Sequence, residues 1–154
     1  MNEKSDRQRL GETSERWVLQ GRTAFQQAST LMAQQSTYRI DIFTYDLDKP
    51  LYDQIAFIDA IKALALHQRG ISTRILIQNS QTVQSEGHRL IELARRLTSK
   101  IEIKRPHADY IDHAENFMIV DKTGYIRRKT ADRYEGEANF SDRLGSKLLT
   151  EFFT

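Results

Sequence analysis

Amphipathic helical stripes alternate with short strand-like runs over the first two thirds of the chain, and this alternation constrains the fold most. Apolar side chains at three- and four-residue steps predict helices over 15–35, 57–69 and 88–100. Short runs rich in apolar, β-branched or aromatic residues predict strands over 38–45, 74–78 and 101–104. Helices that alternate with strands in this order predict parallel strands joined by right-handed crossovers.

After Pro106 the pattern becomes that of antiparallel strands. A polar stretch leads into an apolar run at 117–120, a loop containing glycine and a second strand at 125–129, which predicts a hairpin. Asp142 can cap a last amphipathic helix. We therefore expect an α/β domain over 15–154 with a mixed parallel and antiparallel sheet flanked by helices, preceded by a flexible polar arm over 1–14.

Composition restricts the classes of function and location. The chain has 154 residues, no cysteine, and no apolar run near the roughly 18 residues of a membrane helix. We therefore expect a cytoplasmic protein with no membrane partner, no cofactor and no metal site. The formal net charge of +2 is small, because acidic and basic residues offset one another along the chain. A nucleic-acid partner is on this basis unlikely.

Two segments carry a family resemblance. Residues 114–121 read Ala-Glu-Asn-Phe-Met-Ile-Val-Asp, and residues 136–142 read Gly-Glu-Ala-Asn-Phe-Ser-Asp. They resemble the phospholipase D signature, in which His-x-Lys precedes an apolar strand ending in Asp and a Gly-Ser-x-Asn turn follows. The resemblance implies a phospholipase-D-like half over about 15–154, similar to a bacterial group of half-domains for which no activity is implied.

The same resemblance implies that the catalytic residues are missing. Ala114 stands at the position of the nucleophilic His, Asn116 at that of the phosphate-binding Lys, and Glu137 at that of the Ser. Asp121 and Asn139 match the signature. A side chain without a nucleophilic atom cannot attack phosphorus, so we expect no catalytic residue. His113 is one position away from the nucleophile position, but a register shift of one residue places it on the opposite face of the strand.

A remnant pocket is expected where these positions meet. The charge changes would make this pocket acidic, so that phosphate binds poorly, with Glu137 held by backbone N–H groups, an amide or an arginine. The residues expected to form it are Asn116, Asp121, Glu137, Asn139, Arg127 and Arg133.

Other polar clusters have simpler interpretations. The loop 107–113 contains side chains that can bind zinc or manganese, but their spacing fits no known motif and favours a solvated loop. The residue types around Asp46 and Asp48 indicate a turn rather than a cation site. The basic run 127–133 could contact phosphates, or form salt bridges to neighbouring acidic residues.

Taken together, these features predict a catalytically inactive phospholipase-D-like domain that acts as a structural, interaction or regulatory module. We expect a homodimer, because active relatives combine two such halves, and a protein partner is possible. Two alternatives remain open. One is a phosphodiesterase-related enzyme with altered chemistry that uses Glu137, Asp121 or His113, and the other is a nucleic-acid-binding domain.

Overall fold

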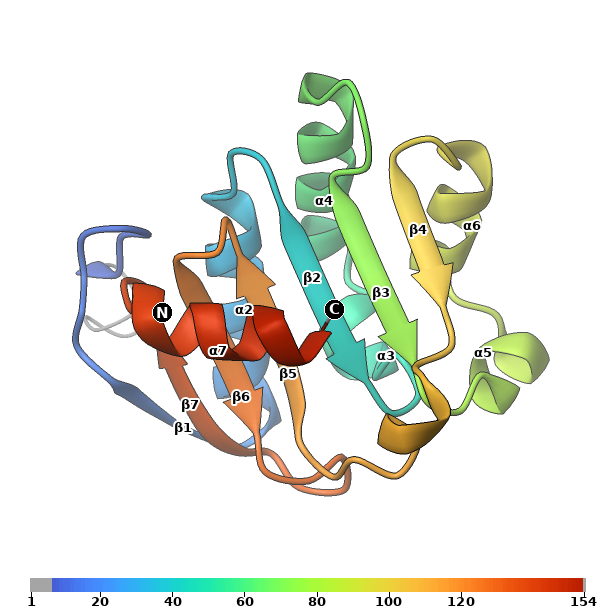
Figure 1. The fold of residues 1–154 in the computed structure, drawn as a ribbon. Helices are drawn as coiled ribbons and strands as arrows, with labels where there is room; N and C mark the ends of the chain where they lie inside the picture. Colours follow the sequence, from blue (N-terminus) through green and yellow to red (C-terminus); the bar gives the residue numbers. More distant parts are fainter. Residues whose placement is uncertain (1–6, 154) are drawn as a thin grey trace.

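One mixed sheet of seven strands organises the molecule, for which a computed structural model describes residues 7–153. The strand order is β1-β7-β6-β5-β2-β3-β4 (Figure 1). The strands are β1 Trp17–Gln20, β2 Ile40–Thr44, β3 Thr73–Ile77, β4 Ile101–Lys104, β5 Asn116–Val120, β6 Gly124–Arg128 and β7 Glu135–Asn139. The pairings β2–β3 and β3–β4 are parallel, and the other pairings are antiparallel. The predicted α/β fold with a mixed sheet is thereby confirmed.

Helices flank both faces of this sheet. The helices are α2 Arg22–Gln34, α3 Lys49–Tyr52, α4 Ile55–His67, α5 Gln81–Glu86, α6 Arg89–Arg96 and α7 Arg143–Phe153, with a 3-10 helix, η1, at Ala108–Tyr110. Helices α2, α4 and α6 lie on one face, while α7 crosses the other face over β6, β5 and β2 (Figure 1). The central strands β2 and β5 are therefore covered on both sides.

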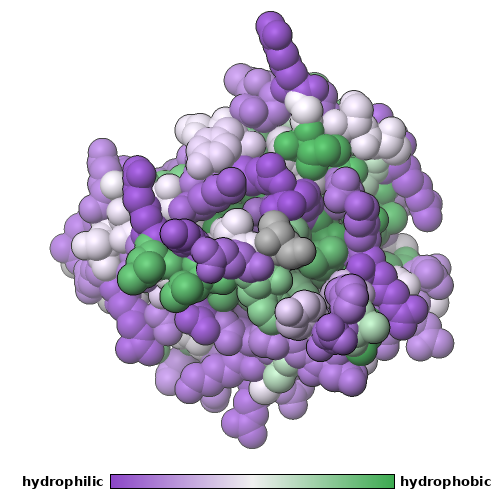
Figure 2. All heavy atoms as spheres, in the orientation of Figure 1, coloured by the Kyte–Doolittle hydropathy of each residue, from purple (hydrophilic) through white to green (hydrophobic). Residues whose placement is uncertain are grey.

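Two hydrophobic cores result from the alternation of side chains along the strands. Ile42 and Met118 enter the larger core beneath α2, α4 and α6. Their neighbours Phe43 and Phe117 enter the smaller core beneath α7, where the two rings stack with centroids 5.4 Å apart. The face that carries α7 is otherwise mainly hydrophilic, with separate small hydrophobic areas (Figure 2). Within residues 7–153, none of the helices is long and apolar enough to cross a membrane.

The last two strands on the antiparallel side, β1 and β7, differ from the sequence prediction. The helix predicted over 15–35 begins only at α2, because residues 17–20 form β1, and Gly21 turns the chain with a φ of 91°. Strand β7, where the resemblance implied the Gly-Ser-x-Asn turn, pairs with both β6 and β1. Trp17 and Leu19 bury their side chains in the larger core, which holds β1 in the sheet.

The N-terminal segment 7–14 packs against the domain, unlike the flexible arm predicted over 1–14. Gln8 is 1% exposed, and the carboxamide of Gln35 donates to its carbonyl oxygen. The backbone N–H of Leu10 donates to the same carboxamide, and that of Gly11 donates to the carbonyl oxygen of Phe140. The first six residues of the predicted arm lie outside the described residues.

Candidate functional site

The carboxyl ends of β2, β3 and β4 meet at one edge of the sheet, beside the start of β5. Ligands of open α/β sheets commonly bind at this edge, because loops from neighbouring strands converge there. A groove of about 550 Å³ opens at this place, lined from α5 and from the loop after η1. Helix α5 lies at the lower right of Figure 1. We call it the carboxyl-end groove. Its lining consists of Tyr45, Ile77, Gln78, Asn79, Ser80, Gln81, Gln84, Ile103, Lys104, Arg105, Ile111 and Asp112.

Buried amides hold the walls of the carboxyl-end groove in place. The Nε2 of Gln78 donates to the carbonyl oxygens of Tyr110, Ile111 and His113, at 3.3, 2.9 and 2.7 Å. These three bonds fix the loop that follows η1 against the end of β3. Because Gln78 is only 8% exposed, they replace contacts that its amide would otherwise make with water.

The exposed chemistry of the groove consists of amides, a phenol, the Ser80 hydroxyl and two cations, with one carboxylate, that of Asp112. Tyr45, Gln81 and Gln84 are exposed and can stack or hydrogen-bond with a ligand. Lys104 Nζ lies 3.5 Å from Glu102 Oε1, and the two side chains are 65% and 37% exposed. The side chain of Arg105 is exposed and forms no ion pair with any residue in 7–153. This surface is equipped to bind an anionic, hydrogen-bonding ligand.

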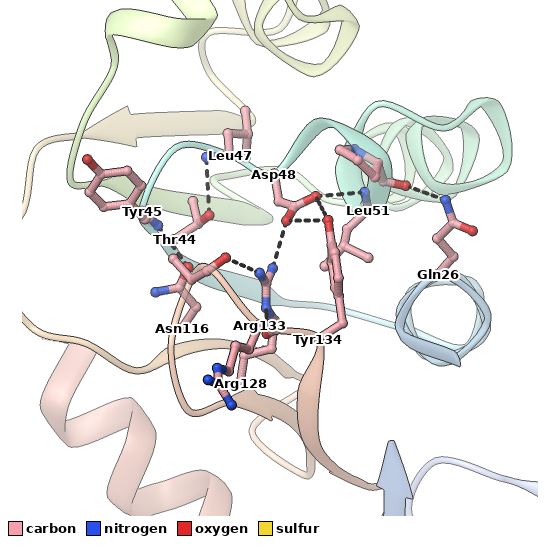
Figure 3. Close-up of polar contacts among 12 residues, drawn as sticks. Gln26, Thr44, Tyr45, Leu47, Asp48, Leu51, Asn116, Arg128, Arg133 and Tyr134 are labelled. Atoms are coloured by element: carbon pink, nitrogen blue, oxygen red, sulfur yellow. Dashed lines mark hydrogen bonds and ion pairs between the residues drawn. The ribbon is translucent and has the colours of Figure 1, made fainter. Parts of the chain in front are cut away.

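A buried polar network lies next to the groove and neutralises the charge of Arg128 (Figure 3). Arg128 Nη1 donates to Asp48 Oδ2 at 2.8 Å, and the side chains are 5% and 10% exposed. Tyr134 Oη donates to both carboxylate oxygens of Asp48, at 3.0 and 3.1 Å. Burial raises the pKa of the Tyr134 phenol, and the Asp48 carboxylate raises it further. Arg128 is therefore a structural cation and is not free to bind an external anion.

The predicted remnant pocket does not assemble. Asn116 lies opposite Arg128 on β6, whereas Asn139 lies opposite Tyr125 at the other end of the same strand. The side chain of Asn116 points toward the larger core together with Met118, while Asn139 alternates with the buried Ala138 and faces the other way. Only the backbone of Arg133 joins the network of Arg128, through its carbonyl oxygen at 3.1 Å.

Asp121 lies at the far end of the sheet and connects two distant segments. Its carboxylate accepts hydrogen bonds from the backbone N–H groups of Thr37, Tyr38 and Arg39, at 2.7, 2.9 and 2.8 Å. A fourth bond comes from the Thr37 hydroxyl at 2.9 Å. This carboxylate thus joins the β5–β6 turn to the start of β2, and its role in the fold is structural.

Glu137 and Arg127 belong to a third region, on the face that carries α7. Glu137 Oε2 accepts from Tyr125 Oη at 3.1 Å and lies 3.2 Å from Arg16 Nε. Burial raises the pKa of Tyr125 to about 12, and Glu137 adds to this shift. Arg127 pairs with Glu115 through two bonds of 2.5 and 3.0 Å. The expected contact of Glu137 with an arginine is present, but the arginine is Arg16.

The remaining candidate positions, Ala114 and His113, lie in the loop before β5. Ala114 is exposed in the loop before β5. The ring of His113 packs on Phe152, with centroids 4.3 Å apart. Throughout the described range 7–153, no group of three or more His, Asp or Glu side chains is placed to hold a metal ion.

The groove residues were missed in the sequence, although one signal pointed to them. Polar or aromatic residues follow each observed parallel strand directly, namely Tyr45 after β2, Gln78 and Asn79 after β3, and Arg105 after β4. Because the carboxyl ends of parallel strands share one edge of the sheet, this signal indicates that the residues that follow the strands lie close together there.

A family model described as "Domain of unknown function (DUF7931)" matches residues 21–154, and the chain belongs to this family. A search of curated proteins gives no significant match. Among solved structures, the chain is similar to TrmBL2, described as an archaeal chromatin protein that shows a novel mode of DNA binding. The two share 15% sequence identity with a TM-score of 0.63. The alignment covers 92% of this chain and 52% of TrmBL2, so this chain spans about half the length of that protein.

This similarity of fold corrects the expectation that a nucleic-acid partner is unlikely. TrmBL2 binds DNA and shares the fold over most of this chain. A net charge of +2 therefore does not exclude this class of partner, because binding depends on where charges gather and not on their sum. The expected homodimer and the cytoplasmic location stay predictions.

Proposed function

We propose that this DUF7931 domain binds nucleic acid without cleaving it, as a catalytically inactive phospholipase-D-like half. The observation that carries the proposal is the carboxyl-end groove, where Lys104 and Arg105 lie beside exposed amides and the half-exposed ring of Tyr45. The similarity in fold to TrmBL2, whose description reports DNA binding, supports the same class of ligand.

The charge and chemistry of the groove suit a phosphate backbone. Lysine and arginine side chains supply most of the affinity for nucleic acids by neutralising phosphates and releasing counterions. Lys104 and Arg105 are both exposed and line the groove, whereas Asp112 is the acidic residue in the lining. Amide side chains can then contact sugar and base atoms, which fix the position of the strand.

The absence of cleavage follows from the side chains at the signature positions. Ala114 has no atom that could attack phosphorus, and Asn116 has no charge to hold a phosphate. Asn116 Oδ1 instead accepts a hydrogen bond from the backbone N–H of Tyr45 at 2.9 Å. His113, the nearest candidate nucleophile, packs against the rings of Phe43 and Phe152.

Fluorescence anisotropy with labelled oligonucleotides over a series of salt concentrations tests the binding. We expect affinity to fall as salt rises, and the double variant Lys104→Ala/Arg105→Ala to reduce the log-log slope by about 1.4 for a single strand. The matched control is Lys62→Ala/Arg69→Ala, which removes two exposed cations outside the groove. No binding at low salt, or an equal loss in the control, would overturn the proposal.

The absence of cleavage has its own test. Gel analysis of oligonucleotides incubated with the purified protein should show intact strands, and a chromogenic phosphodiester should give no turnover. Turnover that persists through purification and disappears with His113→Ala would show that the domain is an enzyme.

A further inference from the structure

Tyr45 is a fixed aromatic surface at the mouth of the carboxyl-end groove. Its side chain is 43% exposed, and its Oη accepts a hydrogen bond from Asn79 Nδ2 at 3.0 Å. Its backbone N–H is held by Asn116 Oδ1 at 2.9 Å. The first contact holds the phenol and the second holds the backbone of Tyr45, so a ligand that stacks on the ring finds it already positioned.

The ring of Tyr45 packs on no other aromatic ring of residues 7–153, unlike that of the other exposed tyrosine near the groove. Tyr110 is 42% exposed, but its ring packs on Phe152 with centroids 4.6 Å apart. Within residues 7–153, Tyr45 takes part in none of the ring contacts that join the aromatic side chains. Every nucleobase has a π face, so an open tyrosine ring can stack on a base of any sequence.

Two glutamines of α5 line the groove with Tyr45. Gln84 Nε2 donates to Ser80 Oγ at 3.1 Å, which leaves its carbonyl oxygen available as an acceptor. The Gln81 side chain is exposed and forms no hydrogen bond with any residue in 7–153. An amide presents one donor and one acceptor group, which matches the paired donors and acceptors on the edge of a base.

The volume of the groove suits a single nucleotide. The groove volume of about 550 Å³ lies within the range of pockets that enclose small ligands, roughly 300–1,000 Å³. Proteins read a duplex by inserting an element into the major or minor groove of the nucleic acid, whereas a concave site on the protein receives a base that has left the stack. Single-strand sites combine such a hollow with cations and an aromatic ring.

From these observations we infer that the carboxyl-end groove binds one unstacked nucleotide of a single strand. The base stacks on Tyr45, its edge meets Gln81 and Gln84, and its phosphates lie beside Lys104 and Arg105. This inference rests on the proposed nucleic-acid binding and names the form of nucleic acid that the site takes.

Anisotropy titrations compare a labelled single-stranded DNA 12-mer, the RNA of the same sequence and the corresponding DNA duplex at one salt concentration. We expect a single strand to bind at least tenfold more tightly than the duplex. Whether DNA or RNA is preferred identifies the natural strand, and both results support the inference. Equal affinity for single strand and duplex overturns it while the proposed function stands, and no binding by any of the three overturns both.

Variants of the ring and of the amides test the contacts. Tyr45→Ala should weaken single-strand binding roughly 5- to 100-fold, whereas Tyr45→Phe, which keeps the ring, should stay within about twofold. Gln81→Ala/Gln84→Ala should weaken binding several-fold, and Thr82→Ala, on α5 outside the groove lining, should not. A circular dichroism melt checks that each variant is folded. Unchanged affinity in Tyr45→Ala overturns the stacking role.

Discussion

Replacement of Asp48 by alanine should be among the most destabilising single changes in this domain. The substitution removes the partner of Arg128, whose side chain is 5% exposed, and leaves a buried guanidinium without a counter-ion. Removing one partner of such a buried ion pair lowers the free energy of unfolding by about 3–5 kcal/mol. Asp48 also caps α3 by accepting from the backbone N–H of Leu51 at 3.3 Å, and loss of a cap costs about 1 kcal/mol. We expect a loss of about 4–6 kcal/mol, from a typical total of roughly 5–15 kcal/mol.

Urea unfolding followed by circular dichroism measures this loss. The midpoint should fall without a change in the slope, since the unfolded surface is the same. Arg128→Met combined with Asp48→Ala should cost less than the sum of the two single changes, because the double variant leaves no unpaired charge. The exposed Asp59 of α4 provides the control, and Asp59→Ala should stay within about 0.5 kcal/mol. A loss below about 1 kcal/mol for Asp48→Ala would refute the reasoning that this network stabilises the fold.

Three further changes test other contacts of the fold. Asp121→Ala removes the acceptor of four hydrogen bonds and should lower the free energy of unfolding by about 3–5 kcal/mol in urea melts; a loss under 1 kcal/mol would contradict its role as a connector. Gly136→Ala would place a Cβ 1.8 Å from a carbonyl oxygen of β6, so we expect a loss of about 3 kcal/mol, whereas Gly70→Ala, with open space around it, should change little. Burial lowers the pKa of His88 below its usual value, so its neutral form favours folding, and stability should fall as pH drops below about 6.5. His88→Gln should flatten this pH dependence of the unfolding free energy, and an unchanged curve would show that His88 does not cause it.

The strands with strong local patterns were predicted well from the sequence. β4 was predicted at its observed position, and the hairpin of β5 and β6 within one residue at each end. These segments alternate or concentrate apolar residues, so local pattern and tertiary position agree. β7 was missed because Glu135 to Asn139 contains residues of low strand propensity, and its pairing with β6 and β1 outweighs that preference.

The site was predicted less well, because its contacts join residues far apart in the sequence. Asp48 and Arg128 are 80 positions apart, and Asn116 and Tyr45 are 71 positions apart. The family signature directed attention to Glu137 and Asn139, which the register places at different heights along β6. The order of residue types along the chain cannot fix the register between β6 and β7 when β7 itself is not recognised as a strand.

The pairing of β1 with β7 also determines how this domain can be shortened. Removing residues 1–20 would leave the outer side of β7 without a neighbour, so its backbone N–H and C=O groups would face solvent. It would also uncover the apolar surface against which Trp17 and Leu19 pack. An open strand edge beside exposed apolar surface is a template for association between chains. A recombinant domain that begins at Gly21, although this follows the family boundary, is therefore expected to aggregate, and a start at or before residue 7 keeps β7 paired with β1.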